Sequence, residues 1–357
     1  MRKTLLSALV AGAFAVGSSA YAGPLTFDLD GPSNAGNVIS AQSLDWAQTS
    51  FLAMGGNTAI NNFAAGTGPT TFDVLTHAKL TAYNDANGVT RSLPGTFLGE
   101  ITVVARFTER VTAVGADFAN FRTTGAGWVE IYYSDTANST NLTGSNFNDG
   151  RVIMRANGVG SAGGSFTIDN FAPVALDGFG TDNYNPGIDG SPTGQKSVSG
   201  FGSQGAISFG SPGNIFLDSN FLKTAVVDFS LFFNNISIGL PYQTVDPSDC
   251  FNPNQANIAS VMITNAQITT GVGNGGLATQ CLNNHVDDTY AMNATDGGYL
   301  PVVGPVNGAL NPNDPDFVAQ TDFNSRVNGT VPEPGMLALV GLALAGLGLS
   351  KVRRRRI

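Results

Sequence analysis

Apolar and polar residues alternate with a period of two in segment after segment of this chain, and this pattern constrains its fold more than any other feature. In residues 71–83, Phe72, Val74 and Leu80 fall on one face, because successive side chains of a strand point to opposite sides. No window of twelve or more body residues shows a helical stripe, although residues 214–223 could hold a short helix. The alternation predicts strands over residues 25–29, 71–83, 99–115, 128–133, 151–156, 165–171, 225–240 and 257–269.

Gly, Asn and Asp dominate the segments between these strands. The chain has 45 glycines, and all but four of its 26 acidic residues are Asp, which favours turns over helix interiors. Short strands separated by turns predict the all-β class, an antiparallel β-sandwich or barrel-like domain with long Gly/Asn/Asp-rich loops. We expect one elaborated core in residues 23–286, with two cores as the alternative, and a polar linker or stalk in residues 287–330.

Residues 1–22 have the pattern of a secretory signal peptide. Arg2 and Lys3 form a basic start, an apolar stretch follows, and Ala20 and Ala22 supply a small-x-small cleavage pattern. We therefore expect the Sec machinery to export the chain and signal peptidase to cut it after Ala22.

The chain after the signal peptide is strongly acidic up to residue 333. Seven of the 17 basic residues lie in residues 1–22 and 334–357, whereas all 26 acidic residues lie in residues 23–333, which leaves ten basic residues there and a net charge of −16. Such a surface repels nucleic acid and anionic lipid. It is compatible with divalent cations and with neutral or cationic glycans.

The last 27 residues, 331–357, combine three features in a fixed order. Pro332, Glu333 and Pro334 form a rigid break, and residues 336–350 carry no charge. A C-terminal hydrophobic helix of about 15 residues would reach roughly 23 Å, short of the roughly 30 Å hydrocarbon core of a bilayer. A basic cluster, which resists translocation, ends the chain. It contains Arg353, Arg354, Arg355 and Arg356.

This tail resembles the PEP-CTERM sorting signal of Gram-negative bacteria. The resemblance implies recognition by an exosortase, a membrane protease-transpeptidase that removes the tail near the Pro-Glu-Pro motif and releases the body outward. The chain would be anchored transiently in the inner membrane and then reach the cell surface or the extracellular space. A plain transmembrane anchor is the alternative, but it needs no Pro-Glu-Pro motif and usually has about 20 apolar residues.

Two cysteines, Cys250 and Cys281, lie in the exported part of the chain. An oxidising compartment favours a disulfide between them, which in the chain-entropy model would stabilise the fold by roughly 3–4 kcal/mol. A metal site is the alternative. It is less favoured because His285, four residues after Cys281, would still need two further ligands.

The sequence contains no recognisable catalytic constellation. His77 and His285 are the only histidines, and no G-x-S-x-G motif is present. The pattern G-x-G-x-x-G occurs at residues 158–163, 200–205 and 271–276, but none of these segments precedes a predicted helix, as a dinucleotide loop requires. We therefore interpret both histidines as isolated surface or loop residues and expect no enzyme.

Acidic residues offer two further hypotheses. Glu100, Glu109 and Glu130 lie in predicted strands, and we interpret them as a solvated strand face rather than as a glycosidase pair. Oxygen ligands in a flexible loop suit Ca²⁺, the one cofactor that the sequence leaves open, although turn chemistry explains the same residues. The candidate calcium ligands, which rest on weak evidence, are Asp177, Asp182 and Asp189.

The body resembles flocculation-associated PEP-CTERM proteins. The similar segments are residues 45–47, 55–57, 72–80, 176–177 and 244–247. The resemblance implies a non-enzymatic protein that acts with exopolysaccharide in floc or biofilm formation. The alternative is a secreted carbohydrate-binding or carbohydrate-active protein.

Overall fold

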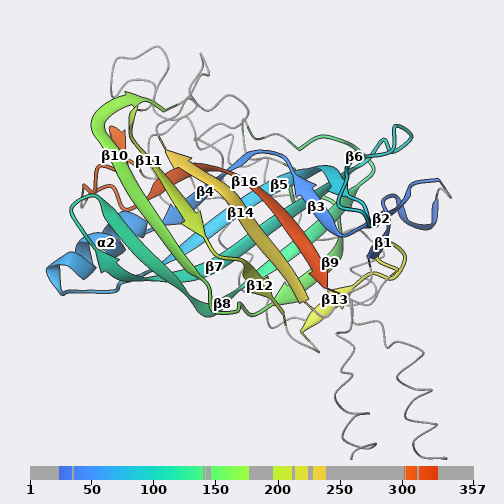
Figure 1. Cartoon of the computed structure of the whole chain (residues 1–357), viewed down its shortest axis with the longest axis horizontal. Coiled ribbons are helices and arrows are strands. Elements are labelled where there is room, and N and C mark those ends of the chain that lie inside the picture. Colours follow the sequence, from blue (N-terminus) through green and yellow to red (C-terminus); the bar gives the residue numbers. More distant parts are fainter. Residues whose placement is uncertain are drawn as a thin grey trace, which may run out of the picture.

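The computed structural model in Figure 1 shows a chain built mainly of antiparallel β-sheet, which confirms the predicted all-β class. The predicted strand at 257–269 and the predicted C-terminal helix lie outside the described residues. The structure describes residues 24–33, 36–139, 141, 146–176, 196–210, 214–223, 228–238, 301, 303–311 and 313–328.

Strands β1 (Leu25–Asp28) and β2 (Val38–Ala41) pair with each other, and a 3₁₀ turn (Gly31–Ser33) lies between them. All other strands belong to one sheet. They are β3 (Ser43–Trp46), β4 (Thr49–Met54), β5 (Thr71–Asn84), β6 (Thr90–Ser92), β7 (Glu100–Val114), β8 (Phe118–Ser134), β9 (Arg151–Asn157), β10 (Gly163–Ala175), β11 (Lys196–Gln204), β12 (Ile207–Phe209), β13 (Ile215–Leu217), β14 (Asp228–Ile238), β15 (Val306–Asn307) and β16 (Phe317–Asn328).

The large sheet closes on itself. Its order runs from β10 through β11, β14, β16, β3 with β4, β5 and β7 to β8, and β8 pairs in turn with β10, from Phe118↔Thr167 to Arg122↔Gly163. Figure 1 shows β11, β14 and β16 crossing in front of β5, β7 and β8, so two walls face each other. Because the path returns to its first strand, the domain is a barrel-like ring without a free edge along this path.

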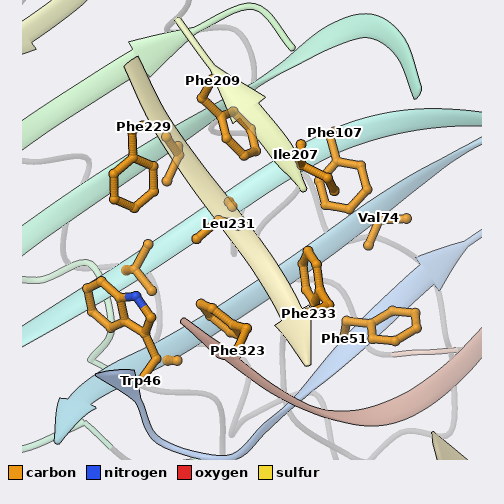
Figure 2. Close-up of a cluster of buried hydrophobic side chains, with 14 of the residues drawn as sticks. Trp46, Phe51, Val74, Phe107, Ile207, Phe209, Phe229, Leu231, Phe233 and Phe323 are labelled. Atoms are coloured by element: carbon orange, nitrogen blue, oxygen red, sulfur yellow. The ribbon is translucent and has the colours of Figure 1, made fainter. Parts of the chain in front are cut away.

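Aromatic side chains from the two walls meet inside the ring. Figure 2 shows Phe107 of β7 near Phe209 of β12 and Phe233 of β14, and the ring centroids lie 6.4 and 6.1 Å from that of Phe107. Phe233 in turn packs against Phe323 of β16 at 5.4 Å. Burial of such large apolar side chains supplies most of the driving force for folding, and tilted or edge-on ring pairs add to it.

The prediction that residues 287–330 form a linker or stalk is wrong where β16 lies. It pairs with β14 on one side and with β3 and β4 on the other, so residues 317–328 belong to the sheet rather than to a linker. Its inward positions alternate apolar and small polar residues: Thr321 is 1% exposed, and Ser325 accepts a hydrogen bond from the indole Nε1 of Trp46 at 2.9 Å. Because some of the inward residues are polar, the segment contains few apolar residues, and the sequence therefore predicted a linker.

Helix α2 (Gly56–Ala65) was not predicted, and the short helix considered at residues 214–223 is wrong. Only Ala59 and Ile60 supply buried apolar side chains to α2, which is too weak a stripe to recognise in ten residues. In the other segment, Ile215–Leu217 forms β13, which pairs with β9. None of the helices within the described residues is long and apolar enough to cross a membrane.

Candidate functional site

All three strand glutamates are buried, so their interpretation as a solvated strand face is wrong. Glu100 is 2% exposed, Glu109 is 4% exposed and Glu130 is 1% exposed. They lie on opposite sides of the ring wall. Glu100 and Glu130 belong to its outer side, whereas Glu109 points into the interior.

A second buried layer covers the outer side of β5, β7, β8 and β9. His77 of β5 is only 3% exposed and stacks on Phe147 with 4.0 Å between ring centroids, so its assignment to the surface is also wrong. The Thr102 hydroxyl donates to the Phe147 carbonyl oxygen at 2.6 Å, which holds this loop against the sheet. Burial lowers the pKa of His77 to about 3, so the folded protein holds it as a neutral ring at physiological pH.

Glu130 and Arg155 form a buried ion pair across β8 and β9. The two residues are direct partners in the strand register, the Arg155 guanidinium contacts the Glu130 carboxylate, and the Tyr132 hydroxyl donates to the same carboxylate. Burial raises the pKa of Glu130, and the positive charge of Arg155 acts against that rise. Burial and the Glu130 charge raise the pKa of Tyr132. This cluster is occupied by its own partners and serves packing.

Glu100 has an equally complete set of partners. Its carboxylate accepts from the Ser139 hydroxyl at 2.7 Å and from the backbone amides of Ser139 and Asn138 at 3.0 and 3.2 Å. Lys79 Nζ lies 3.3 Å from it. Glu100 therefore fastens the loop after β8 to the sheet.

Glu109 lies in the interior, and its carboxylate has fewer partners than that of Glu100. It follows Phe107 and precedes Val111 on the inward face of β7, opposite Phe72 of β5. Within the described part of the chain, Glu109 Oε1 is a buried atom without a hydrogen-bond partner, and the Gln204 side chain at the end of β11 lies beside the same carboxylate. Burial raises the pKa of Glu109 to about 7, which the neighbouring Gln204 amide offsets only in part. The alternation of inward and outward residues along β7 places Phe107 inward, and the same alternation predicts an inward position for Glu109.

Both groups line a small cavity of about 30 Å³, room for about two water molecules. A second cavity of about 50 Å³ lies beside it toward α2, and the two share three phenylalanines of their walls. The interior glutamate, the glutamine and this aromatic wall are the candidate binding site. The phenylalanines of the first cavity are Phe51, Phe72, Phe107, Phe121, Phe166, Phe233 and Phe317.

The other predicted site residues cannot be placed. Among the described residues, no three or more His, Cys, Asp or Glu side chains form a group that could hold a metal ion. The calcium ligands and the disulfide stay predictions, because their residues lie outside the described part of the chain. Lying outside the described residues are Ala20, Ala22, Asp177, Asp182, Asp189, Cys250, Cys281, Pro332, Glu333, Pro334, Arg353, Arg354, Arg355 and Arg356.

Comparison with known proteins identifies the tail alone. Residues 330–355 match the family model described as the PEP-CTERM protein-sorting motif, which confirms the predicted signal. No curated protein and no solved structure matches the chain. The motif implies an exosortase-targeted, exported protein that is anchored transiently in the membrane. No relative supports the resemblance of the body to flocculation-associated proteins, which stays a prediction.

The buried His77 predicts a loss of stability in acid. The unfolded chain binds a proton at its ordinary pKa of 6.5 and the folded chain only near 3, so the stability that His77 contributes is present above pH 6.5 and is lost as the pH falls toward 3. At pH 5 this loss amounts to about 2 kcal/mol. Urea unfolding at pH 8 and pH 5 should show a smaller acid loss for His77→Gln by about that amount.

Glu109 acts in the opposite direction over the same pH range, because its raised folded pKa adds stability as the pH falls below 7. The informative quantity is therefore the difference between the native chain and the His77→Gln variant at each pH. Equal acid losses in the two proteins would contradict a buried, neutral His77.

Proposed function

We propose that the chain is an exported, exosortase-processed surface or extracellular-matrix protein that acts without catalysis, together with exopolysaccharide, in floc or biofilm formation. The match of residues 330–355 to the sorting motif carries this proposal, because the motif directs the body out of the cell. The net charge of −16 over residues 23–333 supports bridging by divalent cations, and excludes nucleic acid as a favoured partner.

The packing of the outer strand carboxylates supports a non-enzymatic role. Glu100 binds the loop after β8, and Glu130 is paired with Arg155, so neither offers a free carboxylate to a glycosidic bond. The proposed partners are exosortase, signal peptidase with the Sec machinery, and exopolysaccharide.

A secreted carbohydrate-binding or carbohydrate-active protein is the second candidate. The outward-facing Phe171 of β10 and Phe201 of β11 are each 57% exposed, and flat apolar rings of this kind offer a surface for sugar rings. Incubating the chain with polysaccharide from its own strain separates the cases. New reducing ends would indicate an enzyme, and retention without cleavage would indicate a carbohydrate-binding protein.

We expect a strain that lacks the gene to secrete exopolysaccharide normally but to grow as dispersed cells. The native gene should restore flocs, and mass spectrometry of the protein recovered outside the cell should find a C-terminus near Pro332, Glu333 and Pro334. Replacing these three residues with alanine should leave the chain unprocessed in the membrane fraction and the cells dispersed.

The control is Val331→Ala, which changes the residue next to the motif and should be processed normally. Flocs that persist after gene deletion would contradict the role in aggregation. An extracellular protein that keeps Arg353–Arg356 would contradict the processing itself, so the two parts of the proposal fail separately.

A further inference from the structure

One row of residues crosses three adjacent strands on the outer face of the ring. Thr167 of β10 is the direct register partner of Phe118 of β8 on one side and of Phe201 of β11 on the other. The row faces outward, because the alternating neighbours Phe166 and Ala119 pack in the core. The Phe118 and Phe201 side chains are 41% and 57% exposed. Single exposed rings are common on soluble proteins, but two rings aligned in one row form a surface that a ligand can cover.

The spacing of the two rings suits an extended sugar chain. One strand lies between Phe118 and Phe201, so they are two strand spacings apart, about 9.6 Å. A β-1,4-linked glycan is an extended ribbon that turns the same face to one side at every second sugar, and this repeat is close to the same length. A chain that runs across the strands can therefore place alternate sugars on the two rings, with the intervening sugar above Thr167.

Polar groups flank the Phe201 ring on both sides along its strand. Ser199 Oγ donates to Asp169 Oδ1 at 2.6 Å, and the hydroxyl oxygens of Ser165 and Ser203 lie 3.1 Å apart. A carboxylate accepts several hydrogen bonds and a hydroxyl both donates and accepts, so these groups can bind further hydroxyls. Aromatic rings between fixed polar groups match a ligand with apolar ring faces and polar edges, which is the chemistry of a sugar. A protein partner would require a continuous apolar patch instead.

The charge beside the row favours a neutral glycan. Within two residues of Phe118, Thr167 and Phe201 along the chain, the ionisable residues are Asp117 and Asp169, and none is basic. Residues 23–333 as a whole carry a net charge of −16. A polysaccharide rich in uronic acids or sulfate groups would be repelled by this surface, whereas a neutral chain would not.

We propose that the row formed by Phe118, Thr167 and Phe201 binds a neutral β-1,4-linked glycan that lies across β8, β10 and β11. This inference rests on the proposed function, in which the protein acts with exopolysaccharide, and it names the sugar chemistry and the surface. Alternate sugars stack on Phe118 and Phe201, which buries apolar ring faces on both sides. Sugar hydroxyls donate to the Asp169 carboxylate on one side of the row and bond with Ser203 on the other.

Cellohexaose is the probe, and maltohexaose, which has the same sugars in α-1,4 linkage, is its matched control. Calorimetric titration of the full-length chain in a polyoxyethylene detergent, which contains no sugar, should show saturable binding of cellohexaose at least tenfold tighter than that of maltohexaose. Phe201→Ala should weaken cellohexaose binding at least tenfold, because it removes one of the two stacking rings. Phe63→Ala, which removes a ring that is 37% exposed on α2, should leave this binding unchanged.

The comparison of the two oligosaccharides on the native chain keeps the test independent of how the variants fold. No cellohexaose binding, equal binding of the two oligosaccharides, or cellohexaose binding that Phe201→Ala leaves unchanged would each overturn the proposal. Sedimentation that shows a native dimer and a Phe201→Ala monomer, without glycan binding, would make the row an interface between copies and would also overturn it. The role in floc formation is decided separately by the deletion strain, because dispersed cells together with no cellohexaose binding would reject this surface alone.

Discussion

The Arg155→Ala variant will have a free energy of unfolding about 3–5 kcal/mol lower than that of the native chain. The substitution removes the counter-ion of Glu130, whose side chain is 1% exposed, and leaves a carboxylate in an apolar layer between β8 and β9. A carboxylate in this position has lost most of its hydration, and the single Tyr132 hydroxyl does not replace an opposite charge. Urea unfolding followed by circular dichroism measures the loss.

Two further variants test the electrostatic origin of this loss. Replacing both partners, Glu130→Gln with Arg155→Met, should recover most of the stability, because no charge then remains buried. Arg91→Ala breaks an ion pair with Asp85 at 2.9 Å in which the arginine side chain is 54% exposed, and it should cost far less stability than Arg155→Ala because solvent screens the pair. If the double variant is no more stable than Arg155→Ala, the loss comes from packing volume rather than from the unpaired charge.

The alternation of apolar and polar residues predicted the strands correctly where one face is apolar and the other polar. The segments around β5, β7 and β14 follow this pattern, and the structure confirms each of them. Alternation is a local property, however, and it does not say which strands pair. The choice between a sandwich and a barrel-like ring depends on the contact of β8 with β10, which no local pattern contains.

The buried outer layer could not be predicted in the same way. Polar residues such as His77, Glu100 and Glu130 alternate with apolar ones, and the usual reason is a solvated face. Here the loop after β8 returns over the sheet and buries that face with Phe147. Whether a polar residue is buried therefore depends on a loop far away in the sequence, and the sequence shows only the residue.

Glu109 is different, because its position was predictable. Every second residue of β7 lies on the same face, and this face carries Phe107, Glu109 and Val111. The alternation alone therefore predicts that the Glu109 carboxyl points inward. A general rule that charged residues face solvent competed with this local pattern, and the pattern was right. Such a conflict between periodicity and residue type is what a functional site often produces.

A chain that ends at Asp316 will not fold cooperatively, whereas a chain that ends at Asn328 will. The first truncation removes β16, which pairs with β14 over Gln320–Asn328 and with β4 over Phe317–Thr321. It also removes Phe317 and Phe323, whose rings pack against Phe51 and Phe233. Loss of one buried phenylalanine costs about 3–5 kcal/mol, so loss of two together with a paired strand is comparable to the whole stability of a domain, about 5–15 kcal/mol.

The chain that ends at Asn328 is the matched control, because it lacks only residues outside the described structure, including the sorting signal. It should show one cooperative thermal transition and the β-sheet circular dichroism of the native chain, while the shorter chain should show neither. If both truncated chains unfold with the same midpoint, residues 317–328 are the peripheral stalk that the sequence first indicated. A difference between them shows that residues 317–328 belong to the folded body.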